Sequence, residues 1–279
     1  WGSSRRGLQT SCSAAATPST AWQAPRVTSP HASLDPHAVS ADLAFTDAGA
    51  LADELAAGRT TSVEAVRTLL ARIEAVDGPG AVHLRSVLAV CPDALEQAAR
   101  LDAERASGTV RGPLHGVPVV VKDNVEVLGM PASAGSLFFG GRPAQRDAPL
   151  ITSLRSAGLV VLGVTNLSEW ANLRSNRSTS GWSALGGLTG NPWALDRSAG
   201  GSSSGSGAAV AAGLAPLAIG TETDGSITCP SSLNGVTGLK PTLGLVPTQG
   251  IVPISASQDM PGPMARSVRD VALLLDALT

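Results

Sequence analysis

The stretch GGSSSGSGAAVAAGLAPLAIGTETDGS, residues 200–226, carries the clearest indication of the fold. A Gly- and Ser-rich loop opens it, a small-residue helical segment runs to Gly213, and an apolar run then leads into a polar turn. Residues 147–166, DAPLITSLRSAGLVVLGVTN, repeat the order of helix, glycine stop and buried strand. Helices that alternate with short apolar strands are typical of a sheet covered on both faces. The sequence therefore predicts an α/β fold.

Further elements surround this pattern. The sequence predicts helices at 46–58, 63–77, 92–108 and 267–278, a buried strand at 116–124, and a helix that opens at Pro230. Thr61 and Glu64 form a capping-box pattern in front of the second of these helices. Ser267 is expected to cap the helix at 267–278, whose apolar residues follow helical spacing.

The composition is that of a globular protein. The 279 residues are 43% hydrophobic and 15% charged, with a net charge of −2, so neither nucleic acid nor a membrane is an expected partner. Residues 198–221 carry no charge, but Gly, Ala and Ser dominate them, which argues against a transmembrane helix. The three cysteines are far apart and suggest neither a disulfide framework nor a zinc site, which fits a reducing compartment such as the cytoplasm.

Residues 1–41 differ from the rest of the chain. The first 34 residues contain three arginines, no Asp or Glu, and many Ser, Thr, Ala and Pro. No apolar segment of the secretory type follows Arg5 and Arg6, so a disordered leader or an organelle-targeting segment is predicted. The chain begins with Trp and ends at a predicted helix, and residues 42–279 are therefore expected to be an incomplete domain, truncated at the C-terminus.

The serine-rich loop allows three interpretations: a phosphate cradle, a site for a catalytic serine, or a linker. A Walker-type loop fails because no lysine follows the glycines before Lys240, and a dinucleotide fingerprint fails because position 210 is Val. GSSSG, residues 201–205, matches a nucleophile elbow, which needs a later histidine. The last histidine of the chain is His115, so that triad cannot form within this sequence.

Lys122 is the candidate base in place of histidine. It ends an apolar strand, where desolvation lowers the pKa of a lysine towards neutrality, although an ordinary ion pair with Asp123 or another acid is the alternative. Gly225 and Ser226 form a second turn whose amide groups are expected to converge as an oxyanion hole. Ser226 is thus a candidate nucleophile and Ser202 a candidate relay, whereas Cys229 is interpreted as a buried structural thiol.

Three separated motifs make the chain resemble the amidase signature family over residues 42–279. They are VKDN (121–124), GGSSSGSGAAVAAG (200–213) and GTETDGSITCPSSLNGVTGLKPT (220–242), in this order and spacing. NLSEWAN (166–172), STSGWSALGGLTGNPW (178–193) and SQDMPGPMARSV (257–268) look most like the peptide-amidase branch, whose members remove C-terminal amide groups from peptides.

The resemblance implies a mixed β-sheet core covered by helices and a Ser–Ser–Lys triad. Lys122 would be the base, Ser226 the nucleophile that forms an acyl-enzyme, and Ser202 the bridging serine after a cis peptide bond to Gly201. The oxyanion amides would come from Thr223, Asp224, Gly225 and Ser226. A lysine, two serines and backbone amides fill every role that this reaction needs, so neither a metal nor an organic cofactor is expected.

Two departures from the family pattern affect the expected substrate. Asp224 stands where the family often has a second glycine, and Thr228 where many members have an arginine that suits a carboxylate-bearing substrate. The expected activity is therefore hydrolysis of neutral primary amides, such as peptide C-terminal amides, with release of ammonia. Two alternatives are the amidase subunit of a tRNA-dependent amidotransferase and an inactive, truncated binding or structural module.

Overall fold

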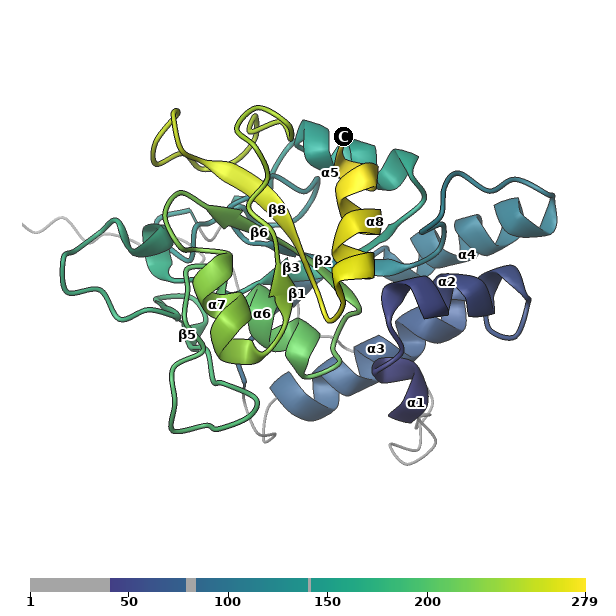
Figure 1. Ribbon diagram of the computed structural model, residues 1–279, viewed down its shortest axis with the longest axis horizontal. Helices are drawn as coiled ribbons and strands as arrows, with labels where there is room; N and C mark the ends of the chain where they lie inside the picture. Colours follow the sequence, from purple (N-terminus) through teal and green to yellow (C-terminus); the bar gives the residue numbers. More distant parts are fainter. Residues whose placement is uncertain (1–40, 79–83, 140–141) are drawn as a thin grey trace, which may run out of the picture.

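The computed structural model describes residues 41–78, 84–139 and 142–279, which build a mixed sheet with helices around it (Figure 1). Its six strands lie in the order β1-β3-β2-β6-β8-β7. The strands are β1 Val87–Val90, β2 Pro118–Lys122, β3 Val160–Thr165, β6 Leu217–Glu222, β7 Thr237–Gly238 and β8 Met260–Ala265. A separate two-stranded sheet pairs β4 Trp182–Ser183 with β5 Gly187–Leu188.

The centre of the sheet is parallel and its edges are antiparallel. β2 runs parallel to β3 on one side and to β6 on the other, whereas β1, β7 and β8 each pair in the antiparallel sense. Every residue of β2, β3, β6 and β8 is buried, so both faces of these strands are covered. The continuous apolar runs follow from this cover, and the predicted α/β fold with a mixed sheet is confirmed.

Helices supply the cover. They are α1 Ala41–Ala44, α2 Ala48–Ala56, α3 Ser62–Asp77, α4 Ala94–Ala106, α5 Pro149–Ser156, α6 Ser204–Ala211, α7 Thr228–Asn234 and α8 Val268–Leu278, with a 3₁₀ turn η1 at Glu169–Asn172. The small-residue helix α6 packs against β1, β2, β3, β6 and β8, and α8 packs against β8 and β6. Because α6 consists of Ser, Gly, Ala and one Val, its backbone can lie close to the sheet.

The predicted helices and their caps are present. The side chain of Thr61 accepts a hydrogen bond from the Glu64 amide, and Ser267 accepts one from the Asp270 amide, both at 3.1 Å. The helix expected to open at Pro230 instead begins at Thr228, and Pro230 occupies its first turn, where a missing amide proton costs nothing. The leader predicted for residues 1–41 lies outside the described residues except for Ala41.

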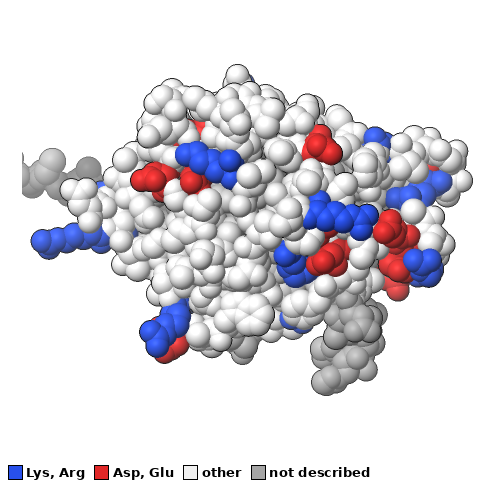
Figure 2. All heavy atoms as spheres, in the orientation of Figure 1, with Lys and Arg blue, Asp and Glu red and all other residues white. Residues whose placement is uncertain are grey.

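Charges of both signs are mixed on the face shown in Figure 2, where Lys and Arg lie beside Asp and Glu and much of the surface is uncharged. Within the described ranges no helix is both long and apolar enough to cross a bilayer. The parallel strands β2, β3 and β6 end at the same edge of the sheet, which brings Lys122, Thr165 and Glu222 to one side of the molecule.

Candidate active site

Lys122 is fully buried at the end of β2. Its Nζ atom donates hydrogen bonds to Ser202 Oγ at 2.7 Å, to Thr221 Oγ1 at 2.9 Å and to the Thr221 carbonyl at 3.1 Å. Burial lowers the pKa of Lys122 to about 7, although the carboxylates of Glu222 and Asp259 act in the opposite direction. This lowered pKa allows the neutral amine, which can accept a proton, to form near neutral pH.

The alternative of an ion pair between Lys122 and Asp123 is wrong. The Asp123 carboxyl accepts hydrogen bonds from the Ser133 hydroxyl and, at 3.2 Å, from the Ser133 amide. Lys122 forms no ion pair with any residue that the structure describes. Burial raises the pKa of Asp123 to about 7, although these hydrogen bonds act to lower it. The Asp123 carboxyl therefore stabilises the loop at Ser133 and does not pair with the lysine.

The serine-rich loop uses its hydroxyl groups in two ways. Of the four serines in the loop, Ser202 is the one that is hydrogen-bonded to Lys122, whereas the other three hydroxyls hold the loop and α6 to neighbouring strands and loops. These supporting bonds join Ser203 to Thr221 (3.1 Å), Ser204 to Thr189 (3.3 Å), and Ser206 to Ile219 (3.0 Å) and Thr165 (2.8 Å). All four serines are fully buried, so a linker is excluded as an interpretation of this loop.

The peptide bond between Gly201 and Ser202 is cis, as the family resemblance implies. A Cβ atom at Gly201 would collide with Ser168 Oγ and lie 2.7 Å from Ser180 Oγ, so only glycine fits there. The Ser202 carbonyl accepts a hydrogen bond from the Ser168 amide at 3.1 Å, which fixes the bridging serine from its other side.

Ser226 follows a glycine whose conformation requires that residue type. Gly225 has φ +76°, and no atom lies within 4 Å of the place where a Cβ would stand, so this side of the turn is open. The Ser226 carbonyl accepts a hydrogen bond from the Ser203 amide at 3.1 Å, which ties the two serine loops together. The Ser226 hydroxyl makes no hydrogen bond to another described residue, so the structure pairs Lys122 with Ser202 but not Ser202 with Ser226.

Glu222 is a site residue that the sequence analysis missed. Its carboxylate accepts hydrogen bonds from the amides of Ile227 (2.7 Å) and Thr228 (2.9 Å) and from the Thr228 hydroxyl (3.2 Å). Burial acts to raise the pKa of Glu222, but these bonds outweigh it and hold the pKa below its usual value. Glu222 thereby caps α7 and fixes the end of the turn that carries Ser226. The signal that could have identified it is an acidic residue shortly before the predicted start of a helix, where a negative charge is stabilising.

The predicted oxyanion residues lie on this turn. Among the described residues, none accepts a hydrogen bond from the amides of Thr223, Asp224 or Ser226. The Gly225 amide instead interacts with the Glu222 carboxylate, so the prediction that it contributes to the oxyanion hole is wrong. The Thr223 side chain instead donates to Asp259, and its carbonyl accepts from Lys240 Nζ at 2.6 Å. The prediction that Cys229 is buried is wrong, because it lies on the exposed face of α7.

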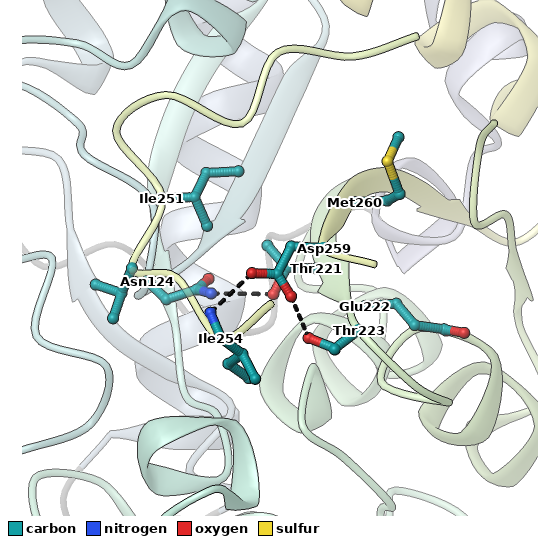
Figure 3. A pocket seen from close by; sticks show the side chains of 9 residues that line it. Asn124, Thr221, Glu222, Thr223, Ile251, Ile254, Asp259 and Met260 are labelled. Atoms are coloured by element: carbon teal, nitrogen blue, oxygen red, sulfur yellow. Dashed lines mark hydrogen bonds between the residues drawn. The ribbon is translucent and has the colours of Figure 1, made fainter. Parts of the chain in front are cut away.

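A pocket lies at Thr221, which is a hydrogen-bond partner of Lys122 (Figure 3). It is lined by Asn124, Thr221, Glu222, Thr223, Ile251, Val252, Ile254, Asp259 and Met260. Asn124 Nδ2 donates to Thr221 Oγ1 at 3.0 Å, so the pocket and Lys122 share the same threonine hydroxyl. No cluster of His, Cys, Asp and Glu suited to a metal ion occurs in the described ranges.

Comparison with known proteins shows to which family the chain belongs. The chain is 45% identical over 239 residues to a Glutamyl-tRNA(Gln) amidotransferase subunit from Thermobifida fusca, covering 85% of this chain and 46% of that protein. The native peptide amidase of Stenotrophomonas maltophilia has 55% sequence identity and a TM-score of 0.82, over 84% of this chain and 48% of that one. An amidase family protein of Bacillus anthracis has 41% identity and a TM-score of 0.81, over 85% and 47%.

The chain thus spans a little under half the length of these relatives. The family model described as Amidase matches residues 64–279, which include the ends of β2 and β6 and the whole serine-rich loop. The resemblance expected from the motifs is therefore confirmed, and the chain belongs to the amidase family.

Proposed function

We propose that the whole protein hydrolyses carboxamides, with Lys122 as base, Ser202 as relay and Ser226 as nucleophile. The observation that carries this proposal is the 2.7 Å hydrogen bond between Lys122 Nζ and Ser202 Oγ in a fully buried setting. A lysine whose pKa lies at about 7 is a competent general base at neutral pH.

In the first half of the reaction, neutral Lys122 takes the proton of the Ser202 hydroxyl, and Ser202 takes the proton of Ser226. The freed Ser226 Oγ attacks the substrate carbonyl carbon and forms a tetrahedral intermediate. The amides of Thr223, Asp224 and Ser226 stabilise its oxyanion, since their N–H groups have no other acceptor among the described residues.

In the second half the proton passes from Lys122 through Ser202 to the substrate nitrogen, the C–N bond breaks, and ammonia leaves. The acyl group remains as an ester on Ser226. Water then attacks this ester with Lys122 again as the base, which releases the carboxylic acid and restores the Ser226 hydroxyl. Atoms balance as amide plus water giving acid plus ammonia.

We further propose neutral primary amides, such as peptide C-terminal amides, as the substrates. Thr228 stands where an arginine would pair with a substrate carboxylate, and its hydroxyl already donates to Glu222. Glu222, Asp224 and Asp259 add negative charge around the turn, which disfavours a carboxylate-bearing substrate. The 55% identity to a peptide amidase supports the same choice.

A second candidate is the amidase step of a tRNA-dependent amidotransferase, which the 45% identity to a protein of that class favours. Glutamine would then be the amide donor and further subunits would be the partners.

The test of the proposed function is ammonia release from an amidated dipeptide by the purified whole protein. We expect steady release by the wild type and none by Ser226→Ala, with Asp276→Asn on the exposed side of α8 as the control that keeps wild-type activity. An inactive wild type that is folded would favour the binding-module alternative.

A further inference from the structure

Asp259 lies next to the site but has no role in the mechanism above. It directly precedes β8, whose first residue Met260 pairs with Glu222 at the end of β6. This register places Asp259 opposite Thr223, the residue that follows Glu222 and begins the turn carrying Ser226.

The carboxylate of Asp259 joins this turn to a separate segment of the chain. One oxygen accepts a hydrogen bond from the Thr223 hydroxyl, and the other accepts from the amides of Ile254 (2.7 Å) and Ser255 (2.9 Å). Figure 3 shows Asp259 between Ile254 and Thr223 in the pocket, while the Glu222 side chain points away from it.

The turn is thus held at both ends by different carboxylates. Glu222 fixes the amides of Ile227 and Thr228 after Ser226, and Asp259 fixes Thr223 before it. Because Ser226 and its neighbouring amides lie between these two anchors, the position of the nucleophile depends on both.

We propose that Asp259 is a positioning residue for the reaction proposed above: it fixes the Thr223 end of the turn that carries Ser226, and its negative charge acts on Lys122. The proposal rests on the proposed function. It assigns Asp259 no direct contact with the substrate.

The charged groups around Lys122 come from three places. Asp123 follows it on its own strand and is bonded to Ser133, Glu222 lies at the end of β6, and Asp259 precedes β8. The neighbouring elements β3 and α6 contribute no charged residue. Glu222 and Asp259 both raise the pKa of Lys122 against the larger effect of burial, so loss of either charge lowers that pKa further.

Two substitutions separate the geometric effect from the charge effect. Asp259→Asn keeps an oxygen for the amides of Ile254 and Ser255 and an NH₂ group that can donate to the Thr223 hydroxyl, but it removes the charge. Thr223→Val removes only the hydroxyl link. Asp276→Asn removes an exposed carboxylate on α8 and serves as the matched control.

The experiment measures kcat, KM and the pH dependence of kcat/KM for amide hydrolysis by the whole protein. For Asp259→Asn we expect the acid limb of the profile to move to lower pH, because a charge that favours the protonated lysine is lost. For Thr223→Val we expect kcat to fall ~10–100-fold with little change in KM and no move of the acid limb.

An active wild type with an unmoved acid limb in Asp259→Asn, or with wild-type kcat in Thr223→Val, would overturn the role of Asp259 and leave the proposed function standing. If Asp259→Asn does not fold, the Thr223→Val result alone decides the positioning role. An inactive but folded wild type would instead overturn the proposed function, and this proposal with it.

Discussion

At the scale of single residues, the proposed chemistry depends on Lys122. A lysine at the end of an apolar strand is visible in the sequence, and the expected lowering of its pKa follows from burial. Its partners were not visible, because the Thr221 hydroxyl and carbonyl reach it only through the pairing of β2 with β6. The position of Asp123 beside Ser133 likewise depends on the folded loop, which the sequence pattern does not reveal.

Replacing Lys122 tests its role as the base. Lys122→Ala should lower kcat/KM ~10²–10⁴-fold, the usual contribution of a general base, and Lys122→Arg should be equally poor because arginine stays protonated. In the wild type, kcat/KM should rise as the pH increases through about 7, since only the neutral amine accepts a proton. The measurement is a pH–rate profile, with circular dichroism to show that each variant is folded. Near-normal turnover of Lys122→Ala at neutral pH would contradict the assignment.

Replacing Ser202 and replacing Ser226 are predicted to slow acylation to different extents. Ser202→Ala should slow acylation strongly, but less completely than Ser226→Ala, because water can replace a relay and cannot replace a nucleophile. Pre-steady-state acylation rates for the two variants measure this order. Ser203→Ala, which removes two hydrogen bonds to the Thr221 backbone and leaves Ser202 in place, is a control for local damage to the loop. A larger loss in Ser202→Ala than in Ser226→Ala would reverse the two roles.

At the scale of elements, the sequence predicts much of the fold and less of the site. Apolar runs and glycine stops identify β2, β3, β6 and the helices beside them, since these signals are local. The two carboxylates that hold the turn carrying Ser226 have no such local signal in the sequence. Asp259 is distant from Thr223 in the chain, and Glu222 acts on amides that only the folded turn presents, so neither contact has a local pattern.

Glu222→Ala tests the cap of α7. The amides of Ile227 and Thr228 would lose their acceptor, and the Ile227 amide is buried, so the loss should cost about 1–3 kcal/mol in the free energy of unfolding. Glu222→Gln should cost less, because the amide oxygen still accepts one of these bonds. Urea unfolding of the whole protein followed by circular dichroism gives both values. Equal stability of Glu222→Ala and wild type would show that the cap contributes nothing.

At the scale of the whole molecule, the described residues form a mixed sheet with helices around it (Figure 1). The two serine loops and the buried Lys122 meet at the edge where β2 and β6 end. The chain spans a little under half the length of the relatives to which it is similar. Substrate choice belongs to this scale, because the whole pocket decides it. The leader predicted for residues 1–41 stays a prediction, because all of it except Ala41 lies outside the described residues. The predicted partners stay predictions because other molecules are needed to test them.

The whole protein is predicted to prefer a neutral primary amide. The kcat/KM for an amidated dipeptide should exceed that for free glutamine, because no arginine stands at Thr228 to pair with a carboxylate. Thr228→Arg should reduce the difference in kcat/KM between the two substrates, because it adds a cation beside the turn. Equal values for the two substrates in the wild type, or a preference for glutamine, would favour the amidotransferase function.

The residue that forms the covalent bond can be located by labelling. The whole protein is treated with a fluorophosphonate that reacts with activated serines, digested, and mapped by mass spectrometry, with Ser226→Ala and Lys122→Ala treated in parallel. We predict one adduct on Ser226 in the wild type, none in Ser226→Ala, and much slower labelling in Lys122→Ala. An adduct on Ser202 or on the exposed Cys229, or labelling of Lys122→Ala at the wild-type rate, would contradict the account.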